Sequence, residues 1–191
     1  MNKQTSLLFS VLVFLLPATL HAGEKAHQHG VAILEVAVDG GTLRLRLESP
    51  LNNLAGFEHA PKNEAQKKTI RAMADKLNRP VTLFAPSPQA KCVPISTRIE
   101  SQVLSPALLQ VAAGNPPAAG KEKAPGHQHE DGHGELIADY EFRCAQPQHL
   151  SAMEVKLFDA FPNLKQLDAQ VAGPRGQKTA RLTSKSRQVA W

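Results

Sequence analysis

The sequence predicts an α+β fold: a largely antiparallel β-sheet or sandwich with one main helix and a long histidine-containing loop. Three observations support this class. Several segments alternate apolar and polar residues, glycine-rich turns join pairs of these segments, and one segment follows the helical period. Antiparallel strands joined by tight turns need no crossover helices, which explains the expected excess of strands over helices.

Residues 31–38 and 42–48 are expected to form a β-hairpin. Both segments alternate, and the second places its leucines opposite Arg44, Arg46 and Glu48. The glycine pair that follows Asp39 is a strong turn signal. Pro50 is expected to end the second strand because proline cannot donate to a strand ladder.

Residues 62–78 are expected to form the main helix. Their apolar residues follow the spacing i, i+3, i+4, i+7, namely Ile70, Met73, Ala74 and Leu77. Pro61 suits the first helical position, and Pro80 prevents continuation.

Further strands are expected along the rest of the chain, at 81–84, 97–104 with a continuation at 108–111, 135–144, 153–158, 166–172, 177–183 and 189–191. The segments at 166–172 and 177–183 flank Gly173-Pro174-Arg175-Gly176 and predict a second hairpin. Residues 112–134 are rich in proline and glycine and have no apolar period, so we expect a flexible His-rich surface loop there.

Residues 1–22 are expected to be a secretory signal peptide, because an apolar run follows Lys3 and small Ala22 closes the segment. Residues 23–191 are long enough for a single α+β domain. No later segment of the sequence is long and apolar enough to span a membrane, so the exported chain is not expected to do so. The formal net charge is +5, without the basic, aromatic-interleaved patch that nucleic acid binding needs.

The chain has two cysteines, Cys92 and Cys144. An even count in an exported protein favours a disulfide over soft metal ligation by the thiols. Cys144 is also in phase with the apolar positions of the strand at 135–144, which places it on the buried face.

The tripeptide His-Gln-His occurs twice, each time just ahead of an alternating segment. Five of the eight histidines lie in these two clusters: His27, His29, His127, His129 and His133. Neutral imidazole is the commonest ligand for divalent transition metals, which suits Zn2+, with Cu2+ or Ni2+ as alternatives. Glu130 and Asp131 could complete a site in the loop.

The two clusters could also share one ion. Each leads into a strand through a His-Gly step, so both would lie at one sheet edge if the two strands run the same way side by side. His59 is a further metal candidate because Glu58 is its neighbour, although a lone histidine at a helix start is more often a capping or packing residue. The alternative for the clusters is a solvated surface tract that binds metals without selection.

Enzyme motifs are missing from the sequence. It contains no H-E-x-x-H, no G-x-S-x-G and no glycine-rich phosphate loop. The cysteines are too far apart for a C-x-x-C redox motif. We therefore expect a binding protein and no enzymatic activity.

The chain resembles the ZrgA-like family, exported proteins of Gram-negative bacteria produced under zinc limitation. The resemblance rests on five segments: His29-Gly30-Val31-Ala32, ESPLNNLAGFEHAPKN at 48–63, the His-rich loop before His133-Gly134-Glu135, YEFRC ending at Cys144, and LFDAFP at 157–162. It covers nearly all of residues 23–191, and the segment at 48–63 is its most specific part.

The resemblance implies a periplasmic zinc-binding protein that assists zinc acquisition beside an ABC-type importer. The family's His-rich region would correspond to His127, His129 and His133, with His27 and His29 near the mature N-terminus. Two other functions remain open on the sequence. One is a non-catalytic interaction module with incidental histidines, and the other is a buffer for copper, nickel or zinc.

Overall fold

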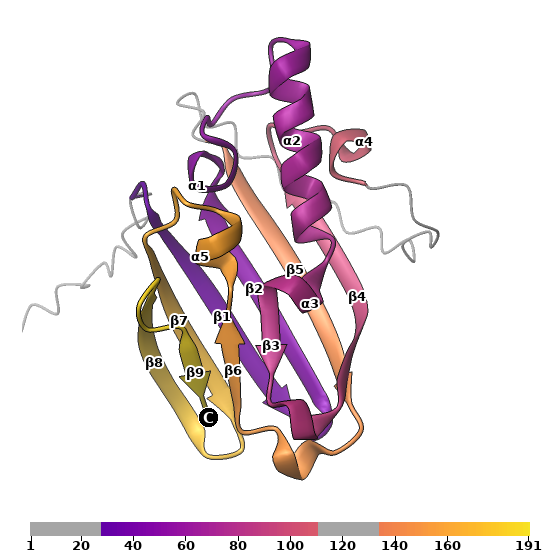
Figure 1. Cartoon of the computed structure of the whole chain (residues 1–191), viewed down its shortest axis with the longest axis vertical. Helices are drawn as coiled ribbons and strands as arrows, with labels where there is room; N and C mark the ends of the chain where they lie inside the picture. The colour runs from indigo at the N-terminus through magenta and orange to yellow at the C-terminus, as the bar shows by residue number, and fades with distance from the viewer. Residues whose placement is uncertain (1–27, 111–133) are drawn as a thin grey trace, which may run out of the picture.

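The fold is known from a computed structural model, which describes residues 28–110 and 134–191. It contains two β-sheets that face each other, together with one long helix and several short ones (Figure 1). The strands are β1 (Val31–Asp39), β2 (Thr42–Pro50), β3 (Phe84–Pro86), β4 (Cys92–Ser101), β5 (Glu135–Cys144), β6 (Ala152–Val155), β7 (Gln166–Gly173), β8 (Gly176–Thr183) and β9 (Gln188–Ala190). The predicted α+β class with a largely antiparallel sandwich is confirmed.

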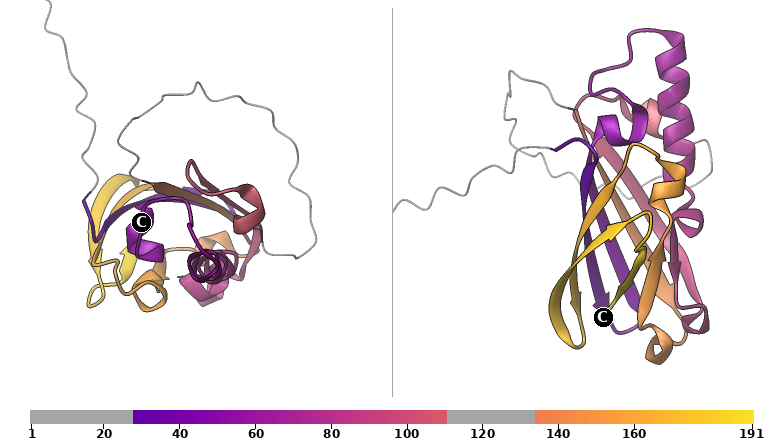
Figure 2. Two further views of the ribbon diagram at one scale, coloured as in Figure 1. Left: turned by 90° about the horizontal axis from the view of Figure 1, so that it is seen from above. Right: turned by 60° about the vertical axis from the view of Figure 1, so that its left-hand side comes forward.

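The larger sheet has six strands in the order β4-β5-β2-β1-β7-β8, and the smaller sheet has the order β3-β6-β9. All neighbouring strands are antiparallel except β1 and β7. The larger sheet curves around α2, α5 and the smaller sheet, which pack on one of its faces (Figure 2). Both predicted hairpins, β1–β2 and β7–β8, are confirmed.

One long helix, α2 (Glu64–Leu77), accompanies several short ones. The short helices are α1 (Leu51–Ala55), α3 (Pro80–Leu83), α4 (Pro106–Leu109), α5 (Leu157–Ala160) and the 3-10 turns η1 (Pro88–Ala90) and η2 (Pro147–His149). The apolar positions predicted for the main helix are all buried in α2. Within the described ranges, no helix has both the length and the apolar character that a membrane span requires.

The start of α2 differs from the prediction. Pro61 is not its first residue, because Asn63 accepts a hydrogen bond from the N–H of Gln66 and caps the helix at Glu64. An asparagine cap satisfies a free N–H of the first turn, and a proline cannot do so.

Three predicted strands are wrong in part because they contain helical turns. Residues 81–84 belong mostly to α3, the described part of 108–111 belongs mostly to α4, and 153–158 divides into β6 and α5. Both α3 and α4 begin with a proline, whose fixed φ suits the first helical position and whose missing N–H weakens a strand. Apolar runs this short also give no usable period.

The inward face of the larger sheet and the inner surfaces of the helices form one hydrophobic core across the described residues. Leu43, Leu45 and Leu47 of β2 are 0–2% exposed. Tyr140 of β5 meets Phe84 of β3 edge to face, with ring centroids 5.1 Å apart, so one aromatic pair joins the two sheets. Burial raises the pKa of the Tyr140 hydroxyl, and the charge of Asp139 adds to the effect.

Cys92 and Cys144 form the predicted disulfide between β4 and β5. Cys144 is 4% exposed, on the buried face expected from its phase in the strand. The bridge removes both thiols as metal ligands.

Candidate metal centre

The strands β1 and β5 both begin at the same end of the larger sheet. Each pairs antiparallel with β2, so β1 and β5 run in the same direction. The predicted common direction is confirmed, but β2 lies between them, so the two strands are not adjacent. Two strand spacings separate their starts by about 10 Å. We call this end, where His29, Glu58 and Gly134 lie, the histidine end.

His29 is presented by a tight turn that precedes β1. The N–H of Val31 donates to the carbonyl of Gln28 at 3.1 Å, which closes a four-residue turn with His29 and Gly30 at its centre. Gly30 has a φ of +83°, the conformation that the third position of a type II turn requires. The backbone therefore requires a glycine after His29, and the turn fixes the backbone position from which the imidazole extends.

Glu58 reaches His29 from the segment between α1 and α2. Gly56 ends α1 with a φ of +84°, and the chain then turns towards β1. His29 Nε2 lies 2.8 Å from Glu58 Oε1, while the His29 side chain is 60% exposed and that of Glu58 only 15%. The imidazole is open to solvent and its carboxylate partner is mostly covered.

Gly134 joins the same place from the start of β5. Its N–H donates to the carbonyl of Glu58 at 2.9 Å, and its own carbonyl accepts from the N–H of Leu51 at 2.8 Å. A Cβ at this position would lie 2.4 Å from the Glu58 carbonyl oxygen and 2.7 Å from a methyl group of Val103. Only glycine allows this approach. Glu58 therefore has two partners at this end: its side chain contacts His29, and its main-chain carbonyl accepts from Gly134.

His59 is close in sequence but is engaged locally. Its ring stacks on Phe57 with centroids 5.1 Å apart, and Nδ1 lies 2.8 Å from the carbonyl oxygen of Ala60. His149 is exposed on η2, beyond the opposite end of β5. The structure thus brings His29 and Glu58 together and leaves His149 apart from them.

The other predicted ligands, His27, His127, His129 and His133 with Glu130 and Asp131, lie outside the described residues. Among residues 28–110 and 134–191, no group of three or more His, Cys, Asp or Glu side chains could hold a metal. Zinc in proteins takes three or four protein ligands. The described part of the chain therefore supplies two candidate groups, and a complete site needs others.

The His29–Glu58 pair can serve a metal in two ways. Zinc bound by both groups would set nitrogen and oxygen about 3.3 Å apart, given tetrahedral bonds of about 2.0 Å. The pair at 2.8 Å would then need to open by about half an ångström. Alternatively, Nε2–H donates to Glu58 and leaves Nδ1 for the metal, an arrangement in which the carboxylate fixes the tautomer and orientation of the imidazole.

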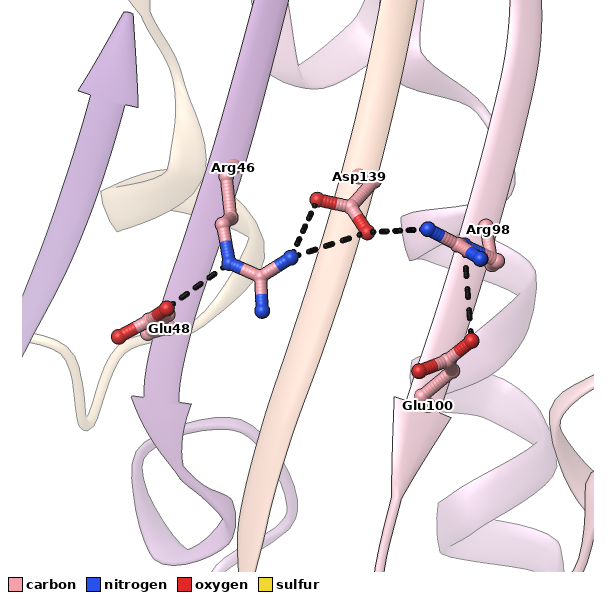
Figure 3. A network of polar contacts seen from close by, with 5 residues as sticks. All are labelled: Arg46, Glu48, Arg98, Glu100 and Asp139. Carbon is pink, nitrogen blue, oxygen red and sulfur yellow. Dashed lines mark hydrogen bonds and ion pairs between the residues drawn. The ribbon is translucent and has the colours of Figure 1, made fainter. Parts of the chain in front are cut away.

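The outward face of the larger sheet is a second polar region. Arg46 of β2 contacts Glu48 and Asp139 at 2.8 and 3.0 Å, and Arg98 of β4 contacts Asp139 and Glu100 at 3.4 and 3.5 Å (Figure 3). The hydrogen bond to Glu48 and the nearby charge of Asp139 raise the pKa of Arg46. Arg46, Arg98 and Asp139 line a groove of about 550 Å³, together with Glu35, Arg44 and Glu141. Three arginines and three carboxylates thus line the groove, so its charged side chains carry no net formal charge.

Sequence reasoning missed part of the histidine end. The sequence indicates Glu58 only as a neighbour of His59 and assigns no role to Asn53, whose side chain accepts from the N–H of Gly30 at 2.6 Å. The signal for Asn53 was a pair of asparagines inside the otherwise apolar stretch at 50–57.

Comparison with known proteins supports a role in zinc uptake. No curated protein matches the chain. The family model described as ZrgA family zinc uptake protein matches residues 26–191, which include the turn at His29, the Glu58 segment and both cysteines. The match covers most of the chain and supports a role in zinc uptake with zinc as the ligand. The chain belongs to the ZrgA family of zinc uptake proteins.

Proposed function

We propose that this protein captures zinc in the periplasm, at the histidine end of its larger sheet, and assists zinc acquisition beside an ABC-type importer. His29 and Glu58 are the fixed part of the site. Further imidazoles come from His27, His127, His129 and His133. His59 is an additional candidate ligand. The protein has no catalytic role in this proposal.

One observation carries the proposal. Glu58 bonds to His29 of the first histidine cluster and to Gly134, the residue that follows the second cluster. His133 directly precedes Gly134, and His27 lies two residues before His29. Consecutive Cα atoms lie only about 3.8 Å apart, and this short connection supports a site that draws on both clusters.

The charge and exposure of the pair suit capture. The exposed imidazole of His29 gives an ion an open approach, and the largely covered carboxylate of Glu58 supplies negative charge next to it. Zinc prefers imidazole and carboxylate ligands in this combination. An exposed ligand such as His29 also favours exchange with a transporter over permanent structural binding.

Calorimetric titration of the untagged mature protein with zinc tests the proposal. We expect a site that is lost or weakened at least tenfold in two variants, His29→Ala and the triple variant of His127, His129 and His133 to Ala. His149→Ala is the matched control, because it removes an exposed histidine outside the histidine end. Equal affinity in all four proteins would overturn the proposed site.

Protons should compete with zinc for the same nitrogens. Imidazole titrates at about pH 6.5 in peptides, and only its neutral form binds metal. We expect zinc affinity to fall as the pH is lowered from 7.5 to 5.5. A titration series at constant ionic strength measures this, and stronger binding at the lower pH would contradict ligation by imidazole. Tighter binding of Cu2+ together with production under metal excess would instead favour a buffer.

A further inference from the structure

Asn53 has an unusual environment in this fold. Apart from the Tyr140 hydroxyl, the buried polar side chains of the described residues are those of Ser49 and Asn53. Asn53 is 2% exposed and lies in α1. A buried polar side chain lowers stability unless its hydrogen bonds are satisfied, so a pair of them at one place calls for a specific role.

The Asn53 amide is almost fully used. Its Oδ1 accepts from the N–H of Gly30 at 2.6 Å, and its Nδ2 donates to the carbonyl of Val31 at 2.9 Å and to Ser49 Oγ at 3.2 Å. Ser49 in turn donates to the carbonyl of Pro50 at 3.1 Å. Both donors and one acceptor position of the amide are therefore satisfied, which fixes its orientation.

Two of these three bonds hold the turn that carries His29. On the opposite side, the carbonyl of Gly30 accepts from the N–H groups of Lys165 and Gln166 at 2.7 and 2.9 Å. The peptide groups next to His29 are thus bonded from both sides, by α1 and by the start of β7. Because the His29 ring itself is 60% exposed, packing does little to place it, and its backbone must do so.

Asn53 is also tied to the second member of the pair. It lies in α1, which is followed directly by the segment that carries Glu58, and Leu51 at the start of α1 bonds to Gly134. One side chain therefore connects the turn of His29 to the helix that precedes Glu58. Removal of the amide would take these two hydrogen bonds from Gly30 and Val31 and would free the turn from α1.

We infer that Asn53 is a positioning residue for zinc, which sets the distance between His29 and Glu58 through its bonds to Gly30 and Val31. The inference rests on the proposed function. Metal ligands must be held within a few tenths of an ångström of their bonding positions, and outer residues that orient ligands typically change affinity by about 10- to 100-fold. Asn53 acts through His29 and Glu58 and is not itself a ligand.

The test compares zinc affinity in Asn53→Ala and in a matched control, Asn78→Ala. The Asn78 amide also donates to two backbone carbonyls, those of Ala74 and Leu109, at the C-terminal end of α2. We expect a loss of about tenfold or more for Asn53→Ala and no change for Asn78→Ala. Circular dichroism and a retained disulfide verify that each variant is folded. Asn53→Ser, whose hydroxyl can replace one of the three bonds, provides the milder variant if Asn53→Ala does not fold.

A double-mutant cycle separates positioning from general damage. In a His29→Ala background, the His29–Glu58 distance that Asn53 sets no longer exists, so we expect Asn53→Ala to cause no further loss of zinc affinity. Equal losses in both backgrounds would overturn the inference and indicate a purely structural effect. Wild-type zinc affinity in the Asn53 variants would overturn the inference but not the proposed function. Absence of zinc binding by the wild-type protein would overturn the proposed function and the inference together.

Discussion

The two ends of β5 are held in different ways. At the end that contains Cys144, which we call the cystine end, a disulfide joins β5 to β4, and the N–H of Cys144 donates to the carbonyl of Gly41 at 2.7 Å. At the histidine end, β5 is held by backbone hydrogen bonds of Gly134 to Glu58 and Leu51. A covalent bond holds the cystine end, whereas backbone hydrogen bonds hold the histidine end, and one of them also positions the residue Glu58.

Both ends depend on a glycine in close contact with a carbonyl. A Cβ at Gly41 would lie 3.0 Å from the Cys144 carbonyl oxygen, and one at Gly134 would lie 2.4 Å from that of Glu58. The closer approach is at the histidine end, where the polar groups gather. We propose that the cystine end serves stability and the histidine end serves zinc binding, and variants at each end can test this division.

Removal of the disulfide should have the largest effect on stability. The bridge joins residues 52 apart, and loss of a loop of this size costs about 4 kcal/mol in the chain-entropy account. We expect the Cys92→Ala, Cys144→Ala variant to lose about that much free energy of unfolding, with zinc affinity unchanged in the folded protein. Urea unfolding and calorimetric titration measure the two quantities. A large loss of zinc affinity would show that stability and zinc binding are not separated between the two ends.

Substitution of the two glycines should give the next largest effect. Gly134→Ala places a methyl group against the Glu58 carbonyl, and overpacking of this kind costs about 1–3 kcal/mol. We expect the upper part of that range, together with weaker zinc binding, because Glu58 must move. Gly41→Ala is the matched control. Its 3.0 Å contact should cost less, and zinc affinity should stay the same.

Neutralisation of Glu58 should separate binding from stability. The His29–Glu58 pair is partly exposed, and such ion pairs contribute about 0–1 kcal/mol, so Glu58→Gln should unfold almost as the wild type does. Zinc affinity should fall about tenfold, because the amide neither carries negative charge nor holds the imidazole as strongly. Glu141→Gln, which removes the partner of Arg44 towards the cystine end, should leave zinc binding intact.

The smallest effect is expected on the outward face of the sheet. Asp139 lies between Arg46 and Arg98, so Asp139→Asn removes the shared anion of both (Figure 3). These groups are partly exposed, and we expect a loss of about 0.5–1 kcal/mol that shrinks as salt is raised. Unfolding at low and high ionic strength measures it. A change in zinc affinity would show that this face takes part in binding.

Much of the fold could be predicted from the sequence because period-two alternation is clear in long strands that bury one face. The β1–β2 hairpin, all of β5 and the β7–β8 hairpin follow directly from it. The disulfide could be predicted because Cys144 continues the apolar phase of β5. Short apolar runs such as 81–84 could not be assigned, since four residues fit a strand and a helical turn equally well.

The histidine end could be predicted only in part. The shared order of histidine cluster and strand predicted one common sheet edge, and the structure places both strand starts there. The intervening β2 and the role of Asn53 depend on contacts between distant segments, which no local pattern records. Glu58 lies 29 residues from its partner His29, so their pairing could not be inferred from spacing.

A crystal structure of the zinc-loaded protein, with anomalous scattering measured at the zinc edge, tests the central claim most directly. We predict an anomalous peak about 2.0–2.1 Å from a ring nitrogen of His29, with the Glu58 carboxylate bound to the same ion or to the other ring nitrogen. A zinc ion held elsewhere, with the direct His29–Glu58 contact retained, would contradict the account.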